Sequence, residues 1–444
     1  MSGLTPERDQ QFRRMRDVAR EIFTSALKNA SIESAFARNV HCERRVLRIG
    51  DDLHDLDSYQ RVFVVSIGKA AHTMAAALEA QLGSRSFEAG IVASSAEPDT
   101  QVRGFRYFHG GHPTPTAESI RAADAILKSL TALDSASLVI FMISGGGSSI
   151  VEKPVDDDIS LPDLAATYRT LVHSGAPIAE INAIRKHLSA VKGGRLAQAA
   201  YPAQQVSILV SDVPDDTPDA LASGPTMPDS TSIQDCERIA AKYKLIDQFP
   251  KSVADLFRQH ALDETPKSDD PAFVRARWWT VLSNQVAIDE AAATATRAGF
   301  AVEVDNSCDD WPYDKAAAYL LNRLRELRRS VSRVCLISGG EVTVAVRNGG
   351  VGGRNQQFAL ACAEPISGHD ITVLSAGTDG IDGNSPAAGA IVDGSTLGRV
   401  KDREAVRHAL SSFNAYPLFD ALGDTLVTGP TGNNLRDLRI LLAY

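Results

Sequence analysis

The sequence is poor in cysteine, and none of its five cysteines stands in a CxxC pair. This odd and unpaired set argues against a disulfide framework or a CxxC zinc site and favours a reducing compartment. No apolar run is long enough to span a bilayer, and the charged start lacks the apolar segment of a secretory signal. We therefore expect a cytoplasmic protein with no membrane partner.

Basic residues are outnumbered by acidic ones: the sequence has 46 Lys and Arg against 55 Asp and Glu, for a formal net charge of −9. This balance argues against nucleic acid as the main partner and leaves a small-molecule substrate as the expectation. The other fractions, 44% hydrophobic and 23% charged, are ordinary for a globular protein. A chain of 444 residues predicts two domains.

Three widespread site motifs are missing. The only Gly-Lys pair, Gly68–Lys69, is followed by Ala70 and has no glycine where a P-loop requires one. The stretch GVGGRN, residues 350–355, has Asn in place of the third glycine of the dinucleotide fingerprint. The nucleophile elbow GxSxG does not occur. These absences disfavour a P-loop nucleotide site, a dinucleotide-dependent dehydrogenase and an α/β-hydrolase.

What the sequence does contain is a repeated pattern of short apolar runs that end in loops bearing Gly or Asp. The runs occupy residues 62–67, 138–143, 206–210, 334–337 and 371–376. Nearly continuous Val, Ile and Leu, with helical patterns between the runs, predict a parallel sheet covered by helices on both faces. In such sheets ligands bind at the carboxyl ends of the strands. We therefore expect these loops to form the ligand-binding edge.

Helices and a domain boundary are also expected. An amphipathic helix near the start has its apolar face at Phe12, Met15, Val18, Ala19, Ile22, Phe23, Ala26 and Leu27. A later helix is predicted to begin with Thr114 as N-cap and Pro115 at its first position. The polar stretch at 262–273 predicts a boundary between an N-terminal domain, 1–265, and a C-terminal domain, 276–444.

The most informative loop follows the run at 138–143 and reads SGGGSS. It consists of Ser144, Gly145, Gly146, Gly147, Ser148 and Ser149. Three consecutive glycines cost folding entropy, so they favour a close approach of something to the backbone, and a row of N–H groups suits an anion. Lys69, after Gly68 at another strand end, would place an ammonium at the same edge. A tight turn and a solvated lysine are the simpler alternatives.

Acidic residues follow other predicted strands. Asp212, Asp379 and Glu341 are placed in this way. Phosphoryl transfer needs a group that accepts the hydroxyl proton, carboxylates that hold Mg²⁺, and cations that neutralise phosphate oxygens. Asp212 or Asp379 would serve the first two needs, and Lys69 with Arg354 the third. Helix caps or Asx turns are the alternative for each acid.

Two further groups have open interpretations. The segment 181–197 is rich in basic residues, including Arg185, Lys186 and Lys192. It predicts either a phosphate- or carboxylate-binding surface or a solvated helix face. His109 and His112 flank two glycines, and their spacing fits a turn, a substrate contact or a metal site.

Taken together, these motifs resemble one family, the glycerate 2-kinases with a C-terminal MOFRL domain. The resemblance extends in order from Ser66 to Leu438 and rests on SIGKAAHTMA, GGHPTP, SGGGSS, NAIRKHLSAVKGGRLA, SDVPDDTPDALASGPT, SGGEVTV, GGRNQQFALA, GTDGIDG, AAGAIVDGST and LVTGPTGNNLRDL. The ordered set is specific, although each motif alone is weak.

The resemblance implies a Rossmann-like N-terminal domain and a smaller MOFRL-type α/β domain, with the active site in the cleft between them. It implies Mg²⁺-dependent transfer of the ATP γ-phosphoryl group to the 2-hydroxyl of D-glycerate. On this basis we predict that Lys69, Asp212 and Arg354 are catalytic. Glu341 and Asp379 would hold the metal. ATP would be bound by Gly68, Ser144, Gly145, Gly146, Gly147, Ser148, Ser149, Lys186, Gly339 and Gly340.

Some positions depart from the family pattern, and they concern metal ligation and substrate shape more than the fold. They are Pro214, Gln357, Asn384, Ser385, Pro386 and Asn433. A kinase of another small 2-hydroxy acid stays open as an alternative, as does an NAD(P)H-dependent hydroxypyruvate reductase, the label that many relatives bear. A sugar-acid sensor without catalysis is the third alternative, and a homodimer is left open.

Overall fold

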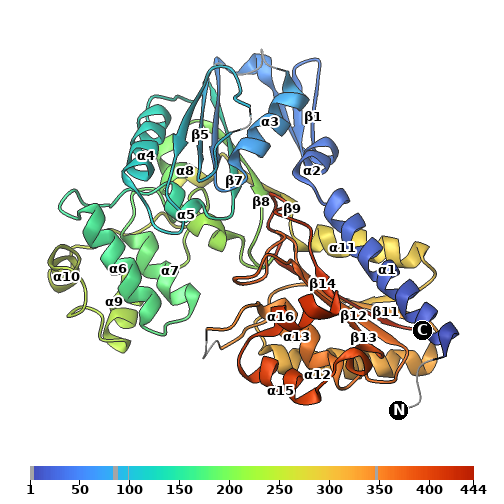
Figure 1. Cartoon of the computed structure of the whole chain (residues 1–444). Coiled ribbons are helices and arrows are strands. Elements are labelled where there is room, and N and C mark those ends of the chain that lie inside the picture. Colours follow the sequence, from blue (N-terminus) through green and yellow to red (C-terminus); the bar gives the residue numbers. More distant parts are fainter. Residues whose placement is uncertain (1–4, 84–88, 99, 346–348) are drawn as a thin grey trace. The chain divides into compact units, whose positions relative to one another are not determined.

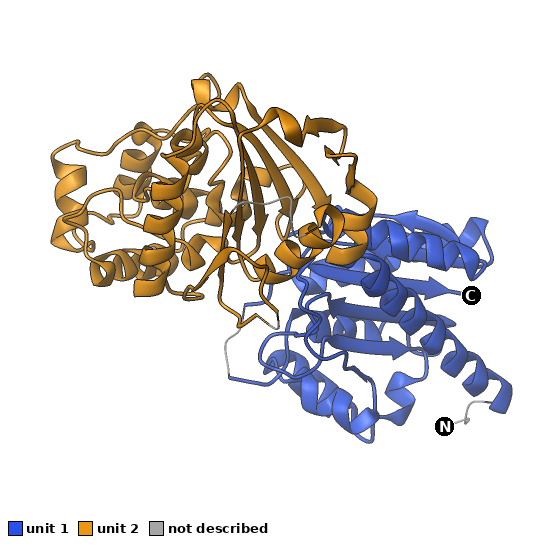
Figure 2. Cartoon of the chain, turned by 90° about the horizontal axis from the view of Figure 1, so that it is seen from above, with its two compact units in different colours: residues 1–31, 282–444 blue, residues 32–281 orange. Residues whose placement is uncertain are grey.

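In the computed structural model, the chain forms two compact units, residues 32–281 and residues 1–31 together with 282–444 (Figure 2). The structure describes residues 5–83, 89–98, 100–345 and 349–444. The units divide the chain differently from the predicted domains, because the first helix clusters with the C-terminal half. The domain limits 1–265 and 276–444, and the cleft between the domains, stay predictions.

The unit of residues 32–281 is built on a six-stranded sheet (Figure 1). Its strands, in spatial order, are β6 (Phe105–His109), β5 (Ala89–Ser94), β4 (Arg61–Ile67), β7 (Ser137–Ser144), β8 (Gln204–Val210) and β9 (Ala276–Leu282). The five strands from β6 to β8 pair in parallel, which confirms the predicted mostly parallel sheet. All eight residues of β7 are buried, as expected for a central strand covered on both faces.

Helices cover both faces of this sheet. The core on one face joins β4, β5 and β7 to α4 (Ala117–Leu130), α5 (Gly147–Ile150) and α8 (Arg195–Ala200). On the other face α3 (Ala71–Leu82) packs against β4, β5 and β7, and α2 (Ile32–Asn39) packs on α3. A small antiparallel sheet of β1 (Val40–Glu43), β2 (Val46–Ile49) and β3 (Asp52–Asp55) adjoins α2.

The start of α4 corrects one prediction. The N-cap is Thr116 rather than Thr114, and the helix begins at Ala117. The backbone N–H of Thr116 donates to the hydroxyl of Ser119 at 3.1 Å, which is the capping-box contact from the N-cap backbone to the side chain of the third helical residue. The same hydroxyl also accepts from the N–H of Gly111 at 3.0 Å, so contacts outside the helix fix its first residue.

A helical cluster with its own apolar core completes this unit. It contains α6 (Leu161–His173), α7 (Ile178–His187), α9 (Ile233–Lys242) and α10 (Lys251–Arg258). The polar stretch 262–273 belongs to the same unit, where the hydroxyl of Thr265 donates to Asp229 at 2.9 Å. It leads into β9, an edge strand of the sheet, and the two compact units meet in sequence only after Val281.

The second unit has a six-stranded sheet of mixed direction. Its order is β10 (Ala301–Val304), β11 (Val334–Ser338), β15 (Asp437–Ala443), β12 (Ile371–Gly377), β13 (Gly389–Asp393) and β14 (Thr425–Leu426). β15 is antiparallel to both β11 and β12, so the expectation that these runs form a purely parallel sheet is wrong here. Because they share this neighbour, β11 and β12 run in the same direction, and their carboxyl ends lie at one edge.

Alternate residues of these strands face two helical layers, as the two-residue period of a strand requires. One layer contains α1 (Pro6–Asn29) and α11 (Asn284–Arg297). The other contains α12 (Tyr313–Ser330), α13 (Arg354–Ala363), α15 (Arg403–Ser411) and α16 (Ala415–Leu422), with α14 (Thr396–Arg399) after β13. Among the described residues, no helix combines the length and apolar character needed to cross a membrane.

Helix α1 confirms the predicted amphipathic helix, but its buried face also contains a charge. Phe12, Met15, Ala19, Ile22, Phe23 and Ala26 are buried, as the pattern predicts. Arg16 is buried with them, and its guanidinium pairs with Asp393 and, at 2.5 Å, with Asp424. The hydrophobic pattern missed this residue because its partners lie nearly 400 positions away in sequence.

We expect Arg16→Met to lower the free energy of unfolding by about 3–5 kcal/mol, because it leaves the buried carboxylate of Asp393 without its guanidinium and removes one of the two guanidiniums that pair with Asp424. Arg13→Met is the matched control in the same helix, since Arg13 is 77% exposed and, among the described residues, pairs with Asp9 alone, one turn away. It should change stability by less than ~0.5 kcal/mol. Urea unfolding of both variants measures the difference. Equal midpoints for the two variants would contradict a stabilising role for the buried pair.

Candidate active site

Three predicted loops meet at one edge of the parallel sheet. β4, β7 and β8 are neighbours, with Ile67 paired to Ile143 and Ser144 paired to Val210, so their carboxyl ends are level (Figure 1). Gly68–Lys69, Ser144–Ser149 and Asp212 follow these three ends. The inference from strand pattern to a shared edge is therefore confirmed for these residues.

Asp212 and the glycine-rich loop are in direct contact. A Cβ atom placed on Gly145 would lie 1.9 Å from Oδ2 of Asp212 and 2.5 Å from its Cγ. A Cβ atom on Gly68, whose φ is +122°, would lie 2.3 Å from the hydroxyl oxygen of Ser144. Glycine is therefore required at both positions because other chain atoms occupy the space of a side chain. The glycines bring the backbone of the loop to the carboxylate.

Lys69 lies against the same loop. Its backbone N–H donates to the carbonyl of Gly145 at 2.9 Å, and its Cγ and Cε atoms would be 3.1 and 3.2 Å from a Cβ on Gly146. The side chain is exposed, and within the described part of the chain its ammonium has no ion-pair partner. Burial and the charge of Lys69 both lower the pKa of His112, which also contacts Gly146. The ammonium is thus available to an anionic ligand.

The loop offers backbone donors that the protein itself does not use. Over the residues that the structure describes, we find no acceptor for the N–H groups of Gly146, Gly147 and Ser148. Gly146 has φ of +81°, which turns the chain into α5. The hydroxyls of Ser148 and Ser223 are 2.7 Å apart, so the segment at Pro218–Ser223 supports the loop from its far side. Free, adjacent amides of this kind are an anion-binding arrangement.

A cavity of about 420 Å³ adjoins the loop. It is lined by His112, Pro113, Thr114, Pro115, Gly146, Ser148, Ser149, Ala165, Tyr168, Arg169, Val172, His173, Arg185 and Lys192. The lining joins the rim of the loop to helices α6 and α7 and to the His112 turn. Of the two flanking histidines only His112 lines it, whereas His109 pairs with Glu97 at 3.2 Å.

The basic segment contributes to this cavity through residues other than the one we predicted. Lys186 is buried, and its ammonium is already 2.8 Å from Asp219 and 3.2 Å from Asp229. Its neighbour Arg185 and the later Lys192 line the cavity instead. Successive residues on a helix point about 100° apart, so the sequence did not reveal which cation faces the ligand. Binding of ATP by Lys186 stays a prediction, and it would require these ion pairs to be exchanged.

The unit of residues 1–31 and 282–444 gathers the remaining predicted residues at its own sheet edge. Nε and Nη2 of Arg354 donate to the two oxygens of Asp437 at 2.6 and 3.0 Å. Nη1 and Nη2 lie 3.0 and 2.7 Å from the two oxygens of Glu341. Burial raises the pKa of Glu341, although the guanidinium opposes this effect. Asp437 was missed because its only sequence signal was a place in the last motif.

Glu341 and Arg354 also line a second cavity, of about 590 Å³. Among the described residues, the charged side chains at its wall are those of Glu341, Arg354, Asp379 and Asp382. Asp382 accepts from the N–H groups of Asn355 and Gln356 at 3.0 and 2.8 Å, so it caps α13. Burial raises the pKa of Asp382 to about 6. Asp382 is therefore a helix cap, while Asp379 lines the cavity from the same loop.

The loop after β11 differs from the loop after β7. The N–H of Gly339 donates to Asn306 and that of Gly340 to Asn284, both at 2.8 Å. The buried Arg439 donates to both glycine carbonyls. Binding of ATP by Gly339 and Gly340 stays a prediction, but their backbone donors already have protein acceptors.

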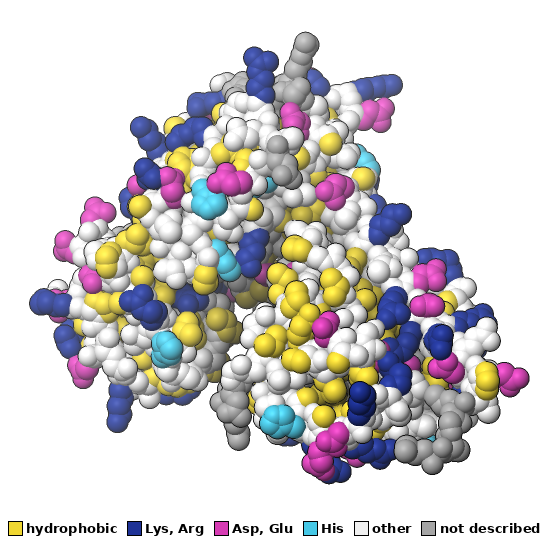
Figure 3. All heavy atoms as spheres, viewed as in Figure 1, with side chains coloured by type: hydrophobic (Ala, Val, Ile, Leu, Met, Phe, Trp, Pro, Cys, Tyr) yellow, Lys and Arg dark blue, Asp and Glu magenta, His cyan; other side chains and the backbone are white. Residues whose placement is uncertain are grey.

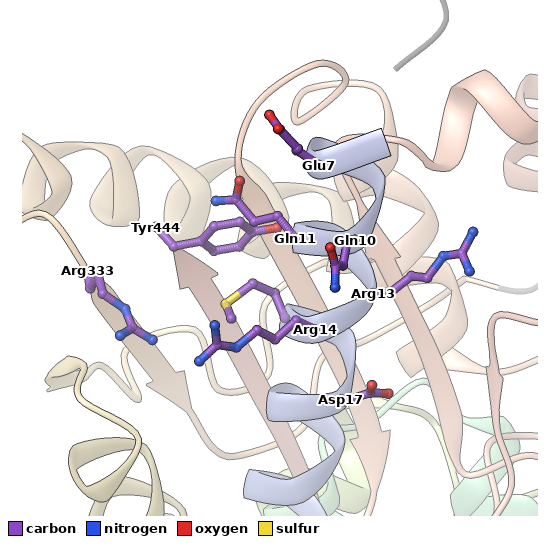
Figure 4. Close-up of a pocket in the computed structure, with 9 residues that line it drawn as sticks. Glu7, Gln10, Gln11, Arg13, Arg14, Asp17, Arg333 and Tyr444 are labelled. Atoms are coloured by element: carbon purple, nitrogen blue, oxygen red, sulfur yellow. The ribbon is translucent and has the colours of Figure 1, made fainter. Parts of the chain in front are cut away.

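A third cavity, of about 750 Å³, lies beside α1 and contains none of the predicted site residues (Figure 4). Arg14 and Arg333 point toward one another across it, and Gln11 lies next to Tyr444 (Figure 4). Lys and Arg side chains are frequent on the surface over α1 (Figure 3). Its lining belongs to the unit of residues 1–31 and 282–444, whereas the three loops belong to residues 32–281, and we do not assign it to the site.

Comparison with known proteins places the chain in a family. Residues 18–258 match the model of a domain of unknown function, DUF4147, and residues 334–437 match the MOFRL family. The D-glycerate 2-kinase of Thermotoga maritima is 36% identical over 86% of this chain and 90% of its own. The chain belongs to the glycerate kinase family. A crystal structure of glycerate kinase from Thermotoga maritima covers 97% of the chain at a TM-score of 0.84 and 32% identity.

Other members of the glycerate kinase family bear two kinds of name. The glycerate 2-kinase of Pyrococcus horikoshii is 34% identical over 86% of this chain and 87% of its own. A relative from Agrobacterium vitis, 35% identical over 96% of this chain and 94% of its own, is provisionally named a hydroxypyruvate reductase. Membership in the family confirms the resemblance inferred from the motifs, and the residue roles stay predictions.

Some departures from the family pattern have structural partners. The side-chain amide of Asn433 donates to the carbonyl of Ala30 at 2.8 Å, and the hydroxyl of Ser385 accepts from Gln356 at 2.7 Å. Gln357 is buried and lines the second cavity. These residues therefore serve local packing in this member of the glycerate kinase family.

Proposed function

We propose that the chain transfers the γ-phosphoryl group of ATP to the 2-hydroxyl of D-glycerate and forms 2-phosphoglycerate. The observation that carries this proposal is the meeting of free loop amides, an unpaired lysine and a carboxylate at the ends of β4, β7 and β8. The glycerate kinases that are similar to the chain over most of its length support the same reaction class.

Each group at this edge has a role in the proposed transfer. The amides of Gly146, Gly147 and Ser148 donate to phosphate oxygens of ATP, and Lys69 stabilises the charge on the migrating phosphoryl group. The 2-hydroxyl oxygen forms the new bond to phosphorus, while the bond from phosphorus to the ADP oxygen breaks. Asp212 accepts the proton that the hydroxyl loses. Both ADP and the phosphorylated product then leave.

As ligands for Mg²⁺, the carboxylates of Asp212 and Glu341 differ. Within the described residues no three His, Cys, Asp or Glu side chains form a cage. Mg²⁺ is commonly held by one or two carboxylates together with substrate phosphates, so Asp212 beside the loop suits it. Glu341 does not fit, because both its oxygens face the guanidinium of Arg354. When bound, Mg²⁺ would neutralise phosphate charge, and Asp379 as its ligand stays a prediction.

Arg354 has a role in the proposal that can be tested against a matched arginine. Arg354→Lys keeps the charge but loses the two-pronged contact with Asp437, and we expect about 10–100-fold lower turnover. Arg399 forms the same kind of contact with Asp424, at 3.0 and 2.6 Å, with similar exposure. Arg399→Lys should lose a comparable amount of stability and keep its activity. Equal turnover in both variants would exclude Arg354 from the reaction.

The test of the proposed function is a product assay. The protein is incubated with ATP, Mg²⁺ and D-glycerate, and the product is coupled to enolase with and without phosphoglycerate mutase. A signal from enolase alone shows phosphorylation at the 2-hydroxyl, whereas a signal that needs the mutase shows the 3-hydroxyl and contradicts the proposal. L-Glycerate and other small 2-hydroxy acids, tested in parallel, define the acceptor.

The provisional name of some relatives favours a second candidate, the NAD(P)H-dependent reduction of hydroxypyruvate. The glycine-rich stretch 350–353 gives it little support, because β11 ends at Ser338 and does not lead directly into these glycines. Loss of nicotinamide absorbance on addition of hydroxypyruvate would favour the reductase over the kinase.

A further inference from the structure

The charged residues described in the lining of the cavity beside the glycine-rich loop are all basic. Its described lining includes the cations Arg169, Arg185 and Lys192 and no Asp or Glu. Most of the remaining wall is apolar and comes from prolines, Ala165 and Val172. A volume of about 420 Å³ with a few converging polar groups is typical of a small-molecule site. A cation of this lining can bind an anionic ligand only if no carboxylate of the protein already neutralises it.

Lys192 is not free, because a buried carboxylate already neutralises it. Glu152 is fully buried, and its Oε2 pairs with the ammonium of Lys192 and accepts from the hydroxyl of Tyr168 at 2.5 Å. Its Oε1 accepts from the hydroxyl of Ser189 at 2.6 Å and from the N–H of Lys153 at 2.9 Å. Each carboxylate oxygen of Glu152 therefore has two donors, so the Glu152–Lys192 ion pair is complete without a ligand.

Arg185 is in the opposite situation. Its guanidinium lies 4.8 Å from the centre of the Tyr168 ring, and that ring is held in turn by the hydrogen bond to Glu152. The Nε atom is buried and has no hydrogen-bond partner, and no ion pair of Arg185 is found among the described residues. Burial lowers the pKa of Arg185, so the cavity holds this charge at a cost. A buried donor without an acceptor is unusual unless a ligand or water supplies one.

We propose that Arg185, whose guanidinium lies over the Tyr168 ring, binds the anionic group of a ligand in the cavity beside the Gly146–Ser149 rim. The chemistry that it recognises is a planar or tetrahedral oxyanion, which a guanidinium contacts through two parallel N–H donors. Two sources supply such a group, the carboxylate of the hydroxy acid and a phosphate of the nucleotide. The inference rests on the proposed function only in naming these two ligands.

The test compares Arg185→Met and Arg185→Lys with Arg238→Met as the control. Arg238 is an exposed arginine of α9 that pairs with Asp235 and does not line the cavity. Binding of D-glycerate, ADP and inorganic phosphate is measured separately by calorimetry on the full chain, and thermal unfolding monitors the fold. We expect Arg185→Met to weaken the binding of at least one ligand by about 10–100-fold. Arg185→Lys should weaken it less, because lysine keeps the positive charge but lacks the paired N–H donors of the guanidinium.

The ligand whose binding is weakened identifies the source of the anionic group. Loss confined to D-glycerate assigns Arg185 to the carboxylate, and loss confined to ADP and phosphate assigns it to the nucleotide. Should Arg185→Met fail to fold, Arg185→Lys must still show the selective loss. Unchanged binding of all three ligands by the Arg185 variants overturns the inference. A wild-type protein that binds none of the three ligands overturns it as well. Arg185-dependent binding without formation of phosphoglycerate would contradict the proposed function and leave this inference standing.

Discussion

Lys69→Met is expected to lower kcat by about 10²–10⁴-fold, because it removes the cation that would stabilise the migrating phosphoryl group. The reasoning depends on two structural facts. The ammonium of Lys69 has no ion-pair partner in the described part of the chain, and its side chain lies beside Gly146. A lysine without an ion pair beside the proposed phosphate-binding loop has no evident structural task, so its loss should affect chemistry rather than folding.

Thermal unfolding should confirm that the Lys69→Met protein is as stable as the wild type, since the side chain is exposed. Lys128→Met provides the matched control. Lys128 is an exposed lysine of α4, a helix that packs on the same sheet, and it has no ion pair among the described residues. Its replacement should leave kcat unchanged. Wild-type turnover in the Lys69→Met protein would refute the assignment of Lys69 and weaken the whole proposal for this sheet edge.

Gly145→Ala is expected to reduce kcat/KM by about 10²-fold or more, although it adds only a methyl group. The new Cβ would stand 1.9 Å from Oδ2 of Asp212, so either the carboxylate or the loop must move. A displacement of about 1 Å at a reacting group is enough for losses of this size. We also expect a decrease in stability of about 1–3 kcal/mol, as for other overpacked sites.

The control for this variant is Gly398→Ala. A Cβ on Gly398 meets no atom within 4 Å, and neither Gly398 nor Gly145 has φ in the left-handed range. Neither substitution therefore forces alanine into the left-handed region, and the space around the new Cβ is the main difference between them. Gly398→Ala should be neutral, or stabilising by up to about 1 kcal/mol. If Gly145→Ala kept wild-type activity in steady-state assays, Asp212 would not need the position that the structure gives it.

The Lys69, Gly145, Arg354 and Arg185 variants address separate parts of the proposal. Lys69 and Gly145 test the loop edge of residues 32–281, and Arg354 tests the cavity of residues 282–444. Arg185 tests which anion enters the cavity beside the loop. Activity lost in all of them would indicate that both units contribute to one reaction, whereas activity retained in Arg354→Lys would restrict the reaction to residues 32–281.

The strand pattern was sufficient to predict that Lys69, Ser144–Ser149 and Asp212 meet. Parallel strands buried on both faces must be apolar throughout, and the first polar residues after them must lie at the carboxyl edge. The amphipathic face of α1 was predictable for a similar reason, since burial on one side of a helix leaves a period of 3.6 residues. These features depend on local geometry, which the order of residues alone determines.

Other features depended on contacts between distant segments, and the sequence did not reveal them. Nothing near Arg16 marks it as buried, because Asp393 and Asp424 come from the far end of the chain. The mixed direction of the second sheet follows from β15, which enters between β11 and β12 after a long separation. Likewise, Arg185 and Lys186 are adjacent in sequence, yet one lines the cavity and the other pairs with Asp219 and Asp229.

The order of residues by itself determined the fold class, the family and the strand-end loops, because each depends on periodicity and on motifs a few residues long. Only the tertiary structure decided which charged groups have partners. Asp437 and Glu341 pair with Arg354, and Asn306 and Asn284 accept from the amides of Gly339 and Gly340, while Lys69 and Arg185 have no ion-pair partner among the residues that the structure describes. The reason is physical: whether a charge is free depends on atoms within a few ångströms in space, whatever their distance along the chain.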